Sequence, residues 1–234
     1  MIRLTFFLLL FAAAQLTLMG QRPNRIANNT RSRSVVTFPS GLSLPVVKES
    51  ARMKREHRDP NRSGNPLLDT GDKYRRKKVS RNFAVGEYAH SGRRVTDVSR
   101  IDPKLVVCLQ QIRNVVGRPV RIDSGYRTFE YNQELYLRRG EKPTRSQHIS
   151  GRATDIRIAD MAGTQIAEAA IDACGPDIGI GIGQRYAHID VRGHFAIWKY
   201  ERVGNGQLAE VRQYRETSRL ALNRSKRGAR RVKG

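Results

Sequence analysis

Two histidines and one aspartate are spaced in a way that could bind a metal ion. His148 and Asp155 lie seven positions apart in SQHISGRATDIRI, and His188 and Asp190 follow in AHIDVR. Alternation along a strand would place His188, Asp190 and Arg192 on one face of AHIDVR. Together, His148, Asp155 and His188 suit a divalent zinc ion and leave a fourth position for water. That is the catalytic rather than the structural pattern of zinc sites.

Small residues separate the first two candidate ligands. Gly151 lets the chain turn tightly, and Ala153 leaves room beside a metal ion. The other histidines fit the metal pattern less well. His57 and His90 are typical of surface or hydrogen-bonded residues, and His194 is a candidate to orient a ligand or to be an ordinary surface residue.

The elements that must position these residues are predicted between residues 80 and 200. A helix is expected over residues 103–116, because Asp102 can cap it, Pro103 suits its first turn and Gly117 can end it. Two further helices are expected at residues 127–140 and 164–174, the second capped by Thr164. Strands are expected at 119–124 and 152–158, and a two-stranded hairpin at 177–200 with its turn near Gly183. This order predicts an α+β fold with a small antiparallel sheet and flanking helices.

The N-terminus carries the pattern of a secretory signal peptide over residues 1–20. Arg3 precedes an apolar run, and cleavage after Ala14 or after Gly20 fits the small residues there. The pattern predicts an exported protein, periplasmic or extracellular and associated with the cell wall.

Positive charge is concentrated outside the predicted domain. Residues 1–79 carry 16 Lys and Arg against 5 Asp and Glu, residues 80–200 carry 18 against 13, and residues 201–234 carry 10 against 3. We therefore expect a largely disordered basic linker at 21–79, a compact domain at 80–200 that folds and binds zinc alone, and a basic C-terminal tail at 201–234. The apolar stretch at 35–47 could also dock on the domain.

The basic tails predict attachment to an anionic envelope polymer or membrane surface, which salt would weaken. A nucleic-acid binder is the alternative that composition allows, but no nucleic-acid motif accompanies the basic runs and only 7% of the residues are aromatic. No specific nucleic acid is expected, and the protein is expected to be a monomer. Cys108 and Cys174 lie in apolar helical patterns and are interpreted as buried thiols, with a disulfide between them as the alternative in an exported chain.

The motifs resemble those of a known family. Ser146-x-His148-x-x-Gly151-x-Ala153-x-Asp155, followed by His188-x-Asp190, resembles the D-alanyl-D-alanine carboxypeptidase-like zinc peptidases, which cut peptidoglycan peptides and have the hedgehog-type domain as a structural relative. NFAVGEYA at 82–89, SGYRT at 124–128 and YN at 131–132 extend the likeness. It covers about residues 80–200 and implies a fold of the hedgehog/DD-peptidase type.

The resemblance also implies roles for individual residues. It implies one Zn²⁺ per chain on His148, Asp155 and His188, and it places Arg127 near the substrate, where it binds a carboxylate or polarises the carbonyl. Tyr126, Ser146 and Gln147 would then help to line the substrate cleft.

One departure from the family pattern concerns the general base. Members place a carboxylate three residues before the second histidine ligand, or a histidine two residues before it, whereas this chain has Arg185 and Tyr186 there. Asp190 is the candidate base because it shares the face of His188. The alternative for Asp190 is a salt bridge to Arg192 or Arg127 that only orients them.

These observations predict a zinc-dependent peptidase that hydrolyses an amide bond in peptidoglycan stem peptides or cross-links, as a carboxypeptidase or an endopeptidase. Zinc would activate its bound water, and Arg127 could hold the developing oxyanion. The alternatives are a zinc-stabilised cell-wall-binding module without turnover, and a basic binder of anionic polymers or nucleic acid.

Overall fold

A computed structural model describes residues 34–91, 94–142, 145–200 and 202–231. The predicted signal peptide at 1–20 and the first part of the predicted linker, at 21–33, lie outside these residues. The described residues fall in one unit, Arg33–Gly234.

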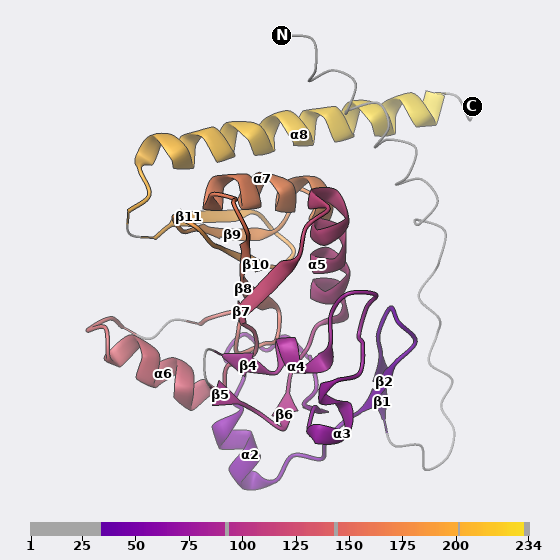
Figure 1. Ribbon diagram of the computed structural model, residues 1–234, viewed down its shortest axis with the longest axis vertical. Helices are drawn as coiled ribbons and strands as arrows, with labels where there is room; N and C mark the ends of the chain where they lie inside the picture. Colours follow the sequence, from indigo (N-terminus) through magenta and orange to yellow (C-terminus); the bar gives the residue numbers. More distant parts are fainter. Residues whose placement is uncertain (1–33, 92–93, 143–144, 201, 232–234) are drawn as a thin grey trace. The chain divides into compact units, whose positions relative to one another are not determined.

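A seven-stranded sheet forms the centre of this unit (Figure 1). Its order is β11 (Ala196–Lys199), β9 (Gly179–Ile182), β10 (Ala187–Asp190), β8 (Ala153–Ile158), β7 (Val120–Ser124), β4 (His90–Ser91) and β5 (Arg94–Val95). The pairs are antiparallel except β11 with β9, which is parallel. The prediction of an α+β fold with a small, mostly antiparallel sheet is confirmed, but β11 was not expected as a separate strand.

Helices cover the sheet with their apolar faces. α5 (Pro103–Val116) packs against α7 (Gly163–Cys174), and α7 contacts β9 and β10 (Figure 1). Asp102 caps α5 through the amide of Lys104, and Gly117 ends it with φ 63°, as predicted. α6 (Phe129–Leu137) is capped by Thr128. The predicted cap of α7 is wrong by two residues, because Ala162 rather than Thr164 is at its N-cap.

The core lies between these helices and the sheet. It includes Leu105, Leu109 and Ile112 of α5, Ile166 and Ala170 of α7, and the strand residues Ile156, Ile180, Ile182 and Ile189. The spacing of these side chains is three to four in the helices and two in the strands, so burial follows the periodicity that predicted each element.

The two cysteines join the helices of this core. Cys108 of α5 and Cys174 of α7 form a disulfide, so the interpretation as buried thiols is wrong and the alternative holds. Because α5 packs directly on α7, the two side chains meet across the helix pair. Sequence spacing could not show this, since 66 residues separate them.

The expected disordered linker is ordered over residues 34–79. It forms β1 (Val35–Thr37), β2 (Ser43–Pro45), α2 (Ala51–Glu56), β3 (Leu68–Asp69) and α3 (Asp72–Arg75), and β3 pairs with β6 (Val98–Ser99). Phe38, Leu44 and Leu68 join the core. Composition hid these elements, because the segment is rich in Lys and Arg and shows no sustained helical or strand period, whereas its apolar side chains join the common core.

The expected C-terminal tail also differs from the structure. Residues 205–231 form a single helix, α8 (Asn205–Arg231), and the rest of the tail, 232–234, lies outside the described residues. Val211 is fully buried where α8 packs on α7. Within the described part of the chain, α8 included, no helix combines the length and apolarity that crossing a bilayer requires.

Candidate metal centre

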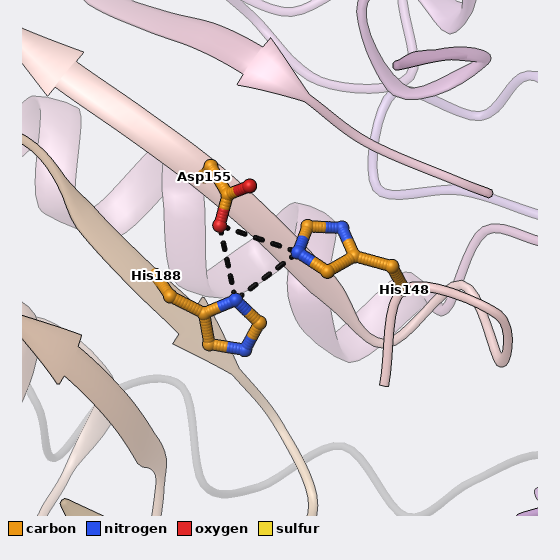
Figure 2. Close-up of side chains that lie close together, drawn as sticks. All are labelled: His148, Asp155 and His188. Atoms are coloured by element: carbon orange, nitrogen blue, oxygen red, sulfur yellow. Dashed lines mark hydrogen bonds and ion pairs between the residues drawn. The ribbon is translucent and has the colours of Figure 1, made fainter. Parts of the chain in front are cut away.

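The pairing of two strands brings two of the three candidate ligands together. His188 of β10 lies directly opposite Asp155 of β8 in the antiparallel register, so both side chains project from the same face of the sheet. The third candidate, His148, comes from the turn at residues 146–151 that leads into β8. Figure 2 shows the three side chains pointing toward one another.

The three potential ligand atoms form a small triangle. His148 Nε2 lies 3.2 Å from Asp155 Oδ1 and 3.1 Å from His188 Nδ1, and His188 Nδ1 lies 3.0 Å from Asp155 Oδ1. Tetrahedral zinc with bonds of about 2.0–2.1 Å would separate its ligand atoms by about 3.3 Å. The spacing therefore fits a zinc ion with little adjustment.

Hydrogen bonds behind the rings direct their lone pairs toward this triangle. His148 Nδ1 lies 2.7 Å from the carbonyl oxygen of Gly125, which can only accept, so in the neutral ring the Nε2 atom carries the lone pair. His188 Nε2 lies 3.1 Å from Asp190 Oδ2, which leaves the lone pair on Nδ1 in the same way. Two nitrogen lone pairs and a carboxylate oxygen thus converge without a hydrogen atom to share, and a bound cation would satisfy all three.

The electrostatics of His148 and Asp155 fit this interpretation, whereas His188 would have to release a proton to bind a cation. Burial and the nearby Arg127 lower the pKa of His148 to about 4, so its imidazole is neutral near pH 7. Burial alone would raise the pKa of Asp155, but His148, His188 and Arg127 hold it well below its usual range. Burial alone would lower the pKa of His188, but hydrogen bonds with Asp155 and Asp190 raise it above its usual value.

Asp190 lies behind His188 rather than beside the ligand triangle. Its side chain is completely buried, and besides the contact with His188 it accepts two hydrogen bonds from the Arg192 guanidinium, at 2.7 and 2.6 Å, and one from the Arg192 backbone amide, at 3.2 Å. A general base must reach the water that it deprotonates. The geometry thus favours the alternative stated for Asp190, a carboxylate paired with Arg192, and adds that it orients the His188 ring.

Arg127 contacts the site through the other carboxylate oxygen of Asp155. Its Nη2 donates to Asp155 Oδ2 at 2.6 Å, and its Nε donates to the hydroxyl groups of Ser91 and Ser124. The guanidinium is therefore fixed beside the candidate metal centre, and 11% of its side chain remains exposed.

The residues predicted to line the substrate cleft differ in accessibility. Ser146 and Gln147 are partly exposed in the turn that carries His148, and Gln147 Oε1 has no hydrogen-bond partner among the described residues. Tyr126 is 2% exposed, and its hydroxyl group lies 2.8 Å from His57 Nδ1. A side chain so deeply buried does not reach a substrate, and so the structure gives Tyr126 a packing role instead.

The comparisons agree with the geometry. Residues 81–190 match the model of the peptidase M15 family. The similarity to this family therefore covers just under half of the chain. The match confirms the resemblance to D-alanyl-D-alanine carboxypeptidase-like zinc peptidases that the motifs predicted.

Curated relatives of this chain act on peptidoglycan by name. Over 99 residues the chain is 31% identical to the peptidoglycan L,D-endopeptidase MepK of Escherichia coli and of Shigella flexneri. The aligned part covers 42% of this chain and 54% of each relative, so the chain spans about half the length of the curated relatives it matches. No solved structure matches the chain.

Glycines of the matched region make room for the side chains around the metal centre. In β9 the isoleucines point into the core, whereas a Cβ atom on Gly179 would lie 2.2 Å from Asp190 Oδ2, and one on Gly181 would lie 2.7 Å from Trp198. The GIGIG pattern therefore leaves one strand face bare for Asp190 and for the aromatic residues near His188. The sequence showed this alternation, but which side chains occupy the bare face follows only from strand order.

Trp198 was not singled out from the sequence. It lies on β11, with its ring centroid 5.1 Å from that of His188 and 6.4 Å from that of Tyr200. The ring centroids of Tyr186 and Tyr200 are 5.4 Å apart. These partly exposed aromatic side chains form one wall beside His188. Recognition of a separate strand at 196–199, paired parallel with β9, would have placed Trp198 beside His188.

Glycine also brings the SGYR segment close to the end of α4 (Val85–Tyr88). A Cβ atom on Gly125 would lie 2.3 Å from the carbonyl oxygen of Tyr88, which accepts a hydrogen bond from the Tyr126 amide at 2.8 Å. Only glycine permits that approach, and the same residue supplies the carbonyl oxygen that orients His148. The predicted tight turn at Gly151 is confirmed by its φ of 66°.

Proposed function

We propose that this protein is a zinc-dependent peptidase that hydrolyses an amide bond in peptidoglycan stem peptides or cross-links. The observation that carries the proposal is the convergence of His148 Nε2, Asp155 Oδ1 and His188 Nδ1 in a chain that matches the peptidase M15 family. The name of the relatives favours an endopeptidase that acts at a bond between an L- and a D-configured residue.

The ligands would hold one Zn²⁺ per chain, which when bound supplies a Lewis acid for the scissile carbonyl and lowers the pKa of a coordinated water. Gly125 and Asp190 keep the two imidazole rings in the tautomers that ligation needs. Arg127 fixes the second oxygen of Asp155 and offers its exposed edge to a substrate carboxylate or to the developing oxyanion. Ser146 and Gln147 provide polar contacts in the cleft, and the Trp198 wall provides an apolar surface.

A second candidate function is a zinc-stabilised peptidoglycan-binding module without turnover. Two observations favour the binding module. The candidate base Asp190 is buried. Arg185 and Tyr186 occupy the positions where family members place the base. The two candidates share the metal centre and differ in hydrolysis.

Incubation of purified peptidoglycan with the zinc-loaded protein, followed by mass spectrometry of the muropeptides, tests the proposal. We expect new products that carry one cleaved stem-peptide or cross-link bond, and none with His148→Ala. Unchanged muropeptides together with zinc-dependent retention on peptidoglycan would contradict hydrolysis and support the binding module.

We also propose that export places the protein at the cell wall and that its basic flanks attach it to an anionic envelope polymer or membrane. The Cys108–Cys174 disulfide supports export, because such bonds persist in oxidising compartments. The excess of Lys and Arg at residues 201–234, 10 against 3 acidic residues, supports attachment. Sedimentation with anionic vesicles or wall polymer should decline as salt rises, and salt-independent binding would contradict an electrostatic contact.

A further inference from the structure

A short segment that precedes the M15 match contacts the turn that carries His148. Residues 57–65, with the sequence HRDPNRSGN, connect α2 to β3 and lie outside the matched residues 81–190. We call these residues the clamp segment. The turn at 146–151, SQHISG, connects to β8 and supplies the candidate ligand His148 from its centre.

The clamp segment binds both ends of that turn. Asn61 Nδ2 donates to the carbonyl oxygen of Ser146 at 3.0 Å and to Ser150 Oγ at 2.9 Å. Ser150 is completely buried, and its hydroxyl group donates to Asp59 Oδ1 at 2.8 Å. Asn65 Nδ2 donates to the carbonyl oxygen of Ser150 at 2.9 Å. Four hydrogen bonds therefore fix the positions two residues before and two residues after His148.

The clamp segment is itself held rigidly. Asp59 accepts hydrogen bonds from the backbone amides of Asn61 and Ser63. Burial alone would raise the pKa of Asp59. These bonds and those from the Ser63 and Ser150 hydroxyl groups outweigh burial and lower its pKa. The buried Arg100 side chain donates to the carbonyl oxygen of His57 at 3.0 Å and to that of Asn65.

The turn needs such support because it is a loop without strand partners of its own. Its internal hydrogen bonds, such as that from the Gly151 amide to the His148 carbonyl oxygen at 3.2 Å, lie at the long end of the normal range. A metal ligand must be held to within about 0.5 Å of its productive position, and loops reach that precision only when their surroundings fix them.

We propose that the clamp segment is a positioning element for the metal centre. By fixing Ser146 and Ser150 it holds the His148 imidazole at the separation from Asp155 and His188 that zinc requires. The inference rests on the proposed zinc site, and it assigns to residues 57–65 a role in metal binding that the M15 match does not contain.

The test compares Asn61→Ala and Asn65→Ala with the wild-type full chain. Zinc affinity is measured by competition with a chelator, the ligand geometry by the visible absorption spectrum of the Co²⁺-substituted protein, and folding by thermal melting. We expect zinc affinity to fall about tenfold or more, as for other residues that orient metal ligands, and the Co²⁺ bands to shift or weaken.

Val211→Ala is the matched control. It removes apolar volume from the contact of α8 with α7, so the melting temperature should fall while zinc affinity and the Co²⁺ spectrum stay unchanged. Asn61→Ala and Asn65→Ala proteins that keep wild-type zinc affinity and a wild-type Co²⁺ spectrum, whether or not their melting temperatures fall, would overturn the clamp proposal.

The outcomes separate the two proposals. Failure of the wild-type chain to bind zinc removes the metal centre, and the clamp proposal falls with it. Zinc binding that is equal in wild type and clamp variants removes the clamp alone. If one of the two clamp variants does not fold, the other is compared with Val211→Ala at a temperature where both proteins are folded. Should neither clamp variant fold at all, Asn61→Ser is substituted and judged by the same two readouts.

Discussion

At the scale of single residues, the metal centre depends on the partners behind its ligands. Gly125 and Asp190 each fix one imidazole, and Arg127 fixes the remaining carboxylate oxygen of Asp155. The convergence of His148, Asp155 and His188 could be predicted from residue type and spacing. Their partners could not, because a backbone carbonyl has no sequence signature and because Asp190 fits a base and an orienting carboxylate equally well in a strand pattern.

Asp190→Asn separates these two roles. We expect the zinc affinity to be about 10 to 100-fold lower. The asparagine amide lacks the negative charge with which the Asp190 carboxylate fixes the tautomer of His188. Chelator competition measures the change. Asp123→Asn is the control. Asp123 is another strand aspartate, and it pairs with Arg121 and Arg157 rather than with a candidate ligand. Normal zinc affinity with lost hydrolysis in Asp190→Asn would instead assign Asp190 as the base.

Zinc binding should also weaken in acid. The pKa of His188 is raised, so its ring keeps a proton up to a higher pH than an ordinary histidine, and zinc must displace that proton. The affinity should therefore rise with pH until His188 is neutral and fall as pH drops through its pKa. Calorimetric titrations at several pH values, with proton release measured from buffers of different ionisation enthalpy, check this. An affinity that is constant between pH 5 and 8 would be inconsistent with His188 as a ligand.

At the scale of elements, periodicity predicted most of what supports the site. The α5 helix, the strands β7 and β8 and the β9–β10 hairpin all follow from spacing and capping residues. Two features did not. β11 pairs parallel with β9, which no local pattern encodes, and the elements of residues 34–79 are stabilised by contacts with the domain rather than by their own propensity.

The disulfide between α5 and α7 should stabilise the domain without contributing to the metal centre. Replacing Cys108 and Cys174 by Ala together should lower the free energy of unfolding by about 2–4 kcal/mol, because the cross-link restricts the unfolded chain. Denaturant unfolding with and without reductant measures the loss, and thiol titration of the denatured wild type should find no free thiol. Two titratable thiols, or unchanged stability in the double variant, would argue against the bond.

At the scale of the whole molecule, the structure argues against a domain that begins at residue 80. Phe38, Leu44, Leu67 and Leu68 are buried at 3% exposure or less, and the clamp segment precedes the M15 match. Charge asymmetry predicted the flanks as tails. Composition shows how basic a segment is, but it does not show whether the apolar residues of that segment are buried in the core.

Truncation tests this boundary. We expect residues 34–231 to fold and bind zinc, and residues 81–200 to melt at a much lower temperature or without cooperativity, because the shorter piece exposes core side chains and lacks both the clamp segment and α8. Calorimetric melting and zinc titration of the two pieces measure the difference. A shorter piece with wild-type melting and zinc affinity would restore the boundary near residue 80 that charge predicted.

The zinc content of the purified protein tests the central claim most directly. Full-length protein prepared without a histidine tag, loaded with Zn²⁺ and dialysed, should contain one zinc ion per chain by elemental analysis, and His148→Ala and His188→Ala prepared identically should contain almost none. Wild type without zinc, or either variant with a full complement, would contradict a metal centre built from His148, Asp155 and His188.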